Sequence, residues 1–296
     1  MRRALVLLGG VAALAAATGL WLTQPPGLHE SWAAGHTADP ATGELIFTAA
    51  GCASCHAAPE AQGEAKRVLA GGIAFASDFG TFYAPNVSSD PDAGIGGWSL
   101  PEFARAVTEG VSREGRHLYP AFPYGSYAGM TPEDVADLFA YMQTLPADAT
   151  PSRAQEVGVP FNIRRGLGLW KLMFLADGPV VEGDLTEQQR HGRYLAETLA
   201  HCGECHTPRN ALGGLERDRW LGGAPNPNGK GKIPNITPGG LDWSEADLVS
   251  YFTTGFTPEY DSVGGEMAAV VDNLAKLPEA DRQAIAAYLK VVPPQQ

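Results

Sequence analysis

Basic side chains are scarce in this chain of 296 residues. Lysine and arginine number 21 against 33 aspartates and glutamates, which gives a formal net charge of −12 at pH 7. Nucleic acids and anionic membrane surfaces attract positive charge, so this balance argues against either as the partner. An acidic surface suits docking to a basic patch on another protein, although such surfaces often serve solubility alone.

Long apolar runs are missing too, except at the N-terminus. Two arginines precede residues 4–22, which carry almost no polar side chain, and this order is typical of an export signal. The run is about as long as a bilayer core requires, and Trp21 lies near its outer end. We therefore expect residues 1–24 to be a retained membrane anchor that leaves the rest of the chain on the periplasmic side. The small residues 15–17 leave open cleavage by a signal peptidase, with release into the periplasm.

Cysteine is limited to four residues, which in an exported protein would normally suggest disulfides. All four fall in two pentapeptides, C-A-S-C-H at 52–56 and C-G-E-C-H at 202–206. Two cysteines one helical turn apart can form thioethers with both vinyl groups of a porphyrin, and the histidine that comes next lies beneath the iron. The sequence therefore predicts two covalent c-type haems.

Other uses of paired cysteines fit less well. Pairs in a zinc ribbon normally lie about 15–20 residues apart, whereas these pairs lie in separate halves of the chain. A thioredoxin-like redox pair needs a βαβ surround, which the sequence does not indicate. A disulfide within each pair leaves both histidines unexplained. The predicted thioether cysteines are Cys52, Cys55, Cys202 and Cys205, and the predicted proximal iron ligands are His56 and His206.

The second half of the chain repeats the first. Matched blocks keep their order: 69–72 with 221–223, 84–87 with 233–236, and 131–141 with 277–288. The first cysteines of the pentapeptides are 150 positions apart, whereas Trp98 and Trp243 are 145 apart. So small a drift indicates two copies of one domain with short loop insertions. We expect these domains at residues 40–146 and 186–293.

Each copy is predicted to be mostly helical. Apolar positions recur at intervals of three and four in 135–142 and in 284–289, and loops rich in glycine, proline and asparagine lie between the helices. Residues 147–185 join the copies, and their apolar part, 161–175, predicts a short helix. That helix either packs between the domains or docks on a membrane surface or a partner.

From about residue 42 to 293 the chain resembles the di- and tri-haem cytochrome c subunits of membrane-bound periplasmic dehydrogenases, which serve alcohol, aldehyde, gluconate-type and nicotinate-type enzymes. The most specific matches are Y-P-A-F-P-Y at 119–124, H-C-G-E-C-H-T-P-R-N at 201–210 and P-N-I-T-P at 234–238. The resemblance implies an all-α fold with two tandem class I cytochrome c-like haem domains behind an N-terminal membrane helix. It also implies a non-catalytic subunit that passes electrons from the dehydrogenase to a quinone, a soluble cytochrome or an oxidase of the respiratory chain.

The distal iron ligands differ between the copies. The resemblance implies that Met267 is the axial ligand of the second haem, and a His/Met pair raises the reduction potential. The corresponding slot of the first copy holds Phe122, which cannot bind iron. Met142 belongs to a helical apolar stripe and Met173 to the inter-domain segment, so we expect Met130, in a loop beside glycine, as the ligand. The alternatives are a di-haem peroxidase-like enzyme with an open first iron and a free-standing membrane-bound carrier.

The same resemblance implies supporting roles around each haem. The tryptophans would pack near the propionate edge, and the asparagines lie in loops beside the ring. The prolines come after the haem histidines, where a backbone carbonyl usually fixes the other imidazole nitrogen. Ordinary packing and turn formation explain each residue equally well. The implied pocket residues are Pro59, Asn86, Trp98, Pro208, Arg209, Asn235 and Trp243.

Overall fold

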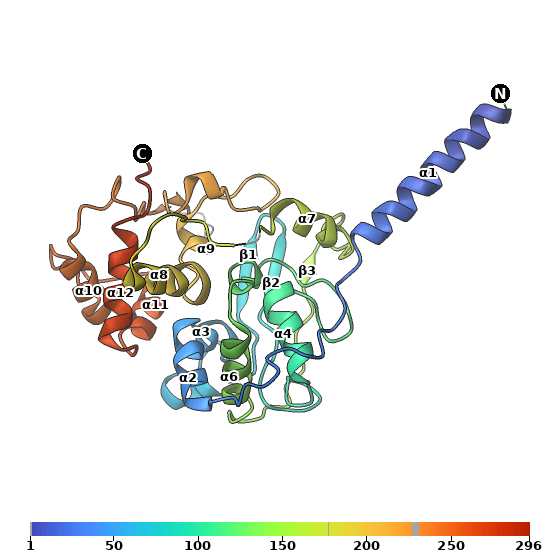
Figure 1. The fold of residues 1–296 in the computed structure, drawn as a ribbon. Coiled ribbons are helices and arrows are strands. Elements are labelled where there is room, and N and C mark those ends of the chain that lie inside the picture. Colours follow the sequence, from blue (N-terminus) through green and yellow to red (C-terminus); the bar gives the residue numbers. More distant parts are fainter. Residues whose placement is uncertain (1, 177, 227–230) are drawn as a thin grey trace.

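The computed structural model describes residues 2–176, 178–226 and 231–296 (Figure 1). Helix α1 (Arg2–Leu22) projects away from the rest of the protein. The first copy contains α2 (Pro40–Ala49), α3 (Cys52–His56), η1 (Gly63–Arg67), β1 (Ala74–Ser77), β2 (Gly80–Tyr83), α4 (Leu100–Glu109), α5 (Tyr124–Tyr127) and α6 (Pro132–Met142). The joining segment contains β3 (Glu156–Val157) and α7 (Gly166–Phe174). The second copy contains α8 (Glu187–Arg193), η2 (Tyr194–Leu199), α9 (Gly203–His206), η3 (Arg217–Arg219), β4 (Ala224–Pro225), β5 (Lys232–Ile233), α10 (Glu245–Thr254), α11 (Met267–Leu274) and α12 (Glu279–Leu289).

Each copy is built around one helix crossing, α2 on α6 and α8 on α12. A glycine lies at the centre of both crossings. A Cβ atom at Gly43 would lie 2.0 Å from the carbonyl oxygen of Asp137, and one at Gly192 would lie 1.8 Å from that of Ala284. Only glycine lets the two backbones approach so closely, and this contact fixes how the first and last helices of each copy cross.

The helices in the middle of each copy begin and end in the same way. Ser99 is the N-cap residue of α4 and Ser244 that of α10, and both serines form a capping box with the acidic residue three positions later. Both helices end at a glycine in the left-handed conformation, Gly110 at φ +60° and Gly255 at φ +74°. These paired signals explain why the Trp-Ser blocks of the two copies start helices of equal length.

The first helix of the second copy contains a π-helical turn, η2. The crossing glycines Gly43 and Gly192 are 149 positions apart, whereas Cys52 and Cys202 are 150 apart. The second copy therefore has one extra residue between its glycine and its first cysteine. A π turn accommodates one extra residue without breaking the helix, so both the crossing glycine and the cysteine keep their places.

The prediction of an all-α fold is wrong, because short strands occupy the loops of both copies. Strands β1, β2 and β3 form an antiparallel sheet in that order, and β4 pairs with β5. The side chain of Gln155 adds to the first sheet, since it accepts from the Tyr83 amide at 2.7 Å and donates to the Tyr83 carbonyl at 2.9 Å. A loop that leaves the helical bundle must satisfy its own backbone groups, and pairing with a neighbouring segment does so.

The prediction of an N-terminal membrane helix is also wrong by the criterion of length and hydropathy. Within residues 2–176, 178–226 and 231–296, no helix is both long and apolar enough to cross a membrane. Residues 2–22 are helical, but alanines and the three glycines Gly9, Gly10 and Gly19 make up much of the segment.

The predicted inter-domain helix is present as α7, and it contacts both copies. The Lys171 amino group donates to the Gly110 carbonyl of the first copy at 2.8 Å, and the Trp170 indole donates to the Leu212 carbonyl of the second at 2.9 Å. Burial lowers the pKa of Lys171 to about 8. The outer face of α7 exposes Leu172 and Met173 to solvent.

The crossing glycines give a testable prediction. We expect Gly43→Ala and Gly192→Ala each to lower the free energy of unfolding by about 1–3 kcal/mol, because the new methyl group overlaps a backbone carbonyl. Gly166→Ala is the control, since nothing lies within 4 Å of a Cβ atom there. Denaturant unfolding of the three variants checks this. Equal stability of Gly192→Ala and Gly166→Ala would show that the crossing tolerates a side chain.

Candidate functional site

Both C-x-x-C-H segments form single helical turns, α3 and α9. The residue before the first cysteine has a left-handed backbone in both copies: Gly51 at φ +64° and His201 at φ +40°. Glycine adopts this conformation freely, whereas histidine does so only when its surroundings hold it there. All four cysteines are free, and burial raises the pKa of the Cys52 and Cys202 thiols to about 12.

The two histidines are held by the same hydrogen bond. Nδ1 of His56 donates to the Pro85 carbonyl at 2.9 Å, and Nδ1 of His206 donates to the Pro234 carbonyl at 2.8 Å. A carbonyl can only accept, so Nδ1 carries the proton and a neutral ring leaves Nε2 with a free lone pair. Burial lowers the pKa of both histidines, which favours the neutral form that binds a metal.

Sequence reasoning missed Pro85 and Pro234 as the residues that orient the histidines. It had placed prolines near this hydrogen bond, but Pro59 is exposed, and the Pro208 carbonyl accepts from the Glu216 amide at 2.9 Å instead. Both missed prolines lie in the matched blocks 84–87 and 233–236. The repeat was therefore the available signal, whereas the folding of each block onto its histidine appears only in three dimensions.

The matched blocks 69–72 and 221–223 hold the C-x-x-C-H turns through the backbone of their histidines. The amide of Gly71 donates to the His56 carbonyl at 2.7 Å, and that of Gly223 donates to the His206 carbonyl at 2.8 Å. Leu69 and Leu221, which begin these two blocks, are completely buried. Each turn is therefore fixed through both its imidazole ring and its backbone.

The predicted pocket asparagines join their loops to the segment that follows the last helix of each copy. The Asn86 amide group donates to the carbonyls of Asp148 at 2.7 Å and Thr150 at 2.8 Å. The Asn235 amide group donates to the Gln295 carbonyl at 2.9 Å. Each asparagine directly follows the proline that orients a histidine, so these bonds hold that proline in place.

The remaining predicted pocket residues are two tryptophans and one arginine. Trp98 and Trp243 are half-buried and pack against the core. The Arg209 guanidinium pairs with the Glu204 carboxylate of the second pentapeptide and donates to the Gly213 carbonyl at 2.8 Å. Whether the tryptophans contact a haem stays a prediction.

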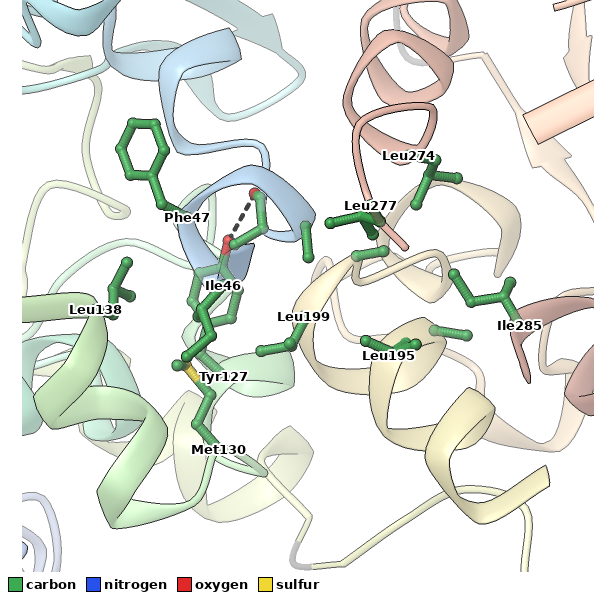
Figure 2. Close-up of a cluster of buried hydrophobic side chains, with 14 of the residues drawn as sticks. Ile46, Phe47, Tyr127, Met130, Leu138, Leu195, Leu199, Leu274, Leu277 and Ile285 are labelled. Atoms are coloured by element: carbon green, nitrogen blue, oxygen red, sulfur yellow. Dashed lines mark hydrogen bonds between the residues drawn. The ribbon is translucent and has the colours of Figure 1, made fainter. Parts of the chain in front are cut away.

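The candidate distal methionines occupy different surroundings. Met267 is the first residue of α11 and packs half-buried against the core. Met130 is 6 % exposed and lies beside Tyr127 in the buried cluster of Figure 2. The tyrosines of the last helices, Tyr141 and Tyr288, are 147 positions apart, and the same separation places Met130 opposite Leu277 in the repeat. Met130 therefore takes a place that a core leucine fills in the second copy, and its role as a ligand stays a prediction.

The donor set fits a covalent haem. Each turn offers two thiols and one neutral imidazole whose Nε2 is available, which are the groups that c-type attachment requires. Throughout the described part of the chain, no group of three or more histidine, cysteine, aspartate or glutamate residues is placed to hold a bare metal ion. The donor set of each turn therefore fits a porphyrin-bound iron.

Comparison with known proteins agrees with this chemistry. Residues 40–146 match the cytochrome c family. A di-haem c-type cytochrome of Cereibacter sphaeroides is 54 % identical over 295 residues, which cover 99 % of both chains. The chain belongs to the di-haem c-type cytochromes. The predictions of two c-type haems and of an electron-transfer role are confirmed.

Two longer relatives also resemble this di-haem cytochrome. The fructose dehydrogenase cytochrome subunit of Gluconobacter japonicus is 39 % identical over 88 % of the cytochrome and 54 % of the relative. The gluconate 2-dehydrogenase cytochrome c subunit of Pantoea cypripedii is 34 % identical over 84 % of the cytochrome and 58 % of the relative. The cytochrome thus spans a little over half of each. The predicted resemblance to dehydrogenase cytochrome subunits is confirmed, and none of these three relatives is named as a peroxidase.

The attachment sites give a second prediction. We expect the mature di-haem cytochrome to gain the mass of two haems and to keep its haem stain on a denaturing gel, because thioethers survive denaturation. The double variant Cys202→Ser/Cys205→Ser should retain one haem mass, since the first turn is unchanged. Intact-mass spectrometry measures both values. A wild-type gain of one haem or none would contradict the assignment of both pentapeptides.

Proposed function

We propose that this cytochrome is the electron-transfer subunit of a periplasmic dehydrogenase. In this proposal a catalytic partner oxidises its substrate, and the cytochrome passes the electrons to a quinone, a soluble cytochrome or an oxidase of the respiratory chain. The observation that carries the proposal is the repetition of the histidine site. Nδ1 of His56 and Nδ1 of His206 each donate to a proline carbonyl, at 2.9 and 2.8 Å. Two equivalent one-electron sites in one chain suit electron conduction. The relatives named as subunits of fructose and gluconate dehydrogenases support the choice of partner.

The proposed haem ligands are the cysteines and histidines of the two C-x-x-C-H turns and two methionines. Each haem supplies a one-electron ferric/ferrous couple when it is bound. The cysteines of each turn hold the porphyrin, and Nε2 of His56 and of His206 binds the iron. Met267 and Met130 are the proposed distal ligands, which would give both irons His/Met ligation and a raised reduction potential.

The proposed location is the periplasm. The order of N-terminal charge and apolar residues supports export. The net charge of −12 supports association with basic patches on the redox partners, because opposite charge speeds encounter. We expect such docking to weaken as salt is added, since screening acts on exposed charges.

The first distal ligand gives a third prediction. We expect Met130→Leu to turn one low-spin haem high-spin and to remove its thioether-to-ferric charge-transfer band. Leucine fills the same core volume, as Leu277 does in the second copy, so the cost in stability should stay below about 1.5 kcal/mol. The exposed Met173→Leu is the control. Suppose instead that wild type already has one high-spin haem and Met130→Leu changes nothing. The first iron would then be open, and peroxide turnover should be measured.

The partnership gives a fourth prediction. We expect the cytochrome to co-purify with a dehydrogenase and to show ferrous absorption bands when the substrate of that enzyme is added. The purified cytochrome alone, mixed with the same substrate, is the control and should stay ferric, because it has no catalytic site for the substrate. Absorption spectroscopy monitors both samples. Reduction of the isolated cytochrome by the substrate would contradict a purely conducting role.

A further inference from the structure

The two C-x-x-C-H turns contact each other's domain through the same position of the pentapeptide. Ser54 and Glu204 both precede the second cysteine of their turn. The Asn273 amide group, on α11 of the second copy, donates to the Ser54 hydroxyl at 3.1 Å. The Ser126 hydroxyl, on α5 of the first copy, donates to the Glu204 carboxylate at 3.2 Å. We call these two bonds the reciprocal pair.

The two bonds are related by the internal repeat. Ser54 and Glu204 are 150 positions apart, as are the cysteines beside them. Ser126 and Asn273 are 147 positions apart, the separation of the tyrosines in the two last helices. In each copy, therefore, the residue before the second cysteine hydrogen-bonds an equivalent residue of the other copy. A contact that repeats in this way is isologous, and the two copies are packed about a local pseudo-two-fold axis, as in a symmetric dimer.

Further contacts bring the starts of the two turns together. The Ala50 carbonyl, two positions before the first cysteine, accepts from the Tyr127 hydroxyl at 3.2 Å, the dashed bond of Figure 2. The centroid of the His201 ring, in the second copy, lies 5.6 Å from that of the Tyr127 ring. A Cβ atom at Gly51 would lie 3.3 Å from Nδ2 of Asn273. The backbone that leads into each turn therefore lies at the domain boundary.

Around these contacts the boundary is mainly apolar, with Leu199 and Leu277 in the cluster of Figure 2. Apolar packing has no fixed direction, whereas hydrogen bonds prescribe the position of both partners. The reciprocal pair is therefore the part of this boundary that can fix one turn relative to the other.

We propose that the reciprocal pair is a positioning contact that sets the separation of the two haem-attachment turns, and with it the rate of electron exchange between the two sites. The exchange moves one electron from the ferrous to the ferric site, and no bond forms or breaks. A small displacement of reacting groups lowers a rate steeply. The loss of a contact at the turn itself should therefore slow electron exchange between the two sites. The proposal rests on the proposed function, in which haems are attached at Cys52, Cys55, Cys202 and Cys205.

The test uses the full-length di-haem protein. One site is reduced by a short pulse of radiolysis, and equilibration between the haems is measured by absorption. We expect Asn273→Ala and Ser54→Ala each to slow equilibration several-fold. The double variant should be no slower than either single variant, because both remove the same bond. Ser54→Thr should restore the wild-type rate, since it keeps the hydroxyl. Asn162→Ala, at an exposed asparagine, is the matched control and should equilibrate like wild type.

A second measurement separates positioning from a general loss of structure. Redox titration gives the two midpoint potentials and the amount by which reduction of one site opposes reduction of the other. We expect the variants to reduce that coupling while intact mass still shows two haems. Ser126→Ala tests the other bond in the same way, should the Asn273 variant fail to fold. Wild-type equilibration rates in both Asn273→Ala and Ser126→Ala would overturn the proposal, whereas a missing haem mass would instead contradict the attachment.

Discussion

The hydrogen bond from each haem histidine to a proline carbonyl is the constraint that organises both copies. It fixes the proton on Nδ1 at His56 and His206 and leaves the Nε2 lone pair of a neutral ring free. The carbonyl can act only if its loop is held, and the asparagine next to each proline binds that loop to the segment that follows the last helix of its copy. Gly71 and Gly223, in two other matched blocks, donate their amides to the backbone carbonyls of the two histidines. The matched blocks at 69–72, 84–87, 221–223 and 233–236 thus hold two imidazole rings in place.

The two copies show how much change this arrangement tolerates. A one-residue difference before the cysteines is accommodated in the π turn at 194–199, and the helix crossing and the attachment turn keep their places. The copies also differ at the positions of the proposed distal ligands, where Phe122 corresponds to Met267, and Met130 to the buried Leu277. The surroundings of the two histidines are therefore more alike than the positions of the proposed distal ligands.

Features set by local chemistry and by repetition were predictable from the sequence. The pentapeptides, the matched blocks and the helical stripes were visible as patterns, and the family and cofactor inferred from them are confirmed. The strands were not predictable, because their pairing joins β2 to the distant segment 156–157 through contacts such as that of Gln155. Nor could the Pro85 carbonyl be assigned, since a backbone atom has no residue preference. The prediction of a membrane helix was wrong, because no helix of the described residues is both long and apolar enough to cross a membrane.

The pseudo-two-fold packing has a consequence for how strong the boundary between the copies must be. In a dimer of separate chains, two bonds of about 3.1–3.2 Å and a modest apolar cluster would have to outweigh the full entropic cost of association. Here residues 147–185 join the halves, so the contact between them forms within one chain. The contact between the copies is therefore not needed to hold the two halves together. Its residues can diverge to suit each half, as a serine and a glutamate have done at 54 and 204.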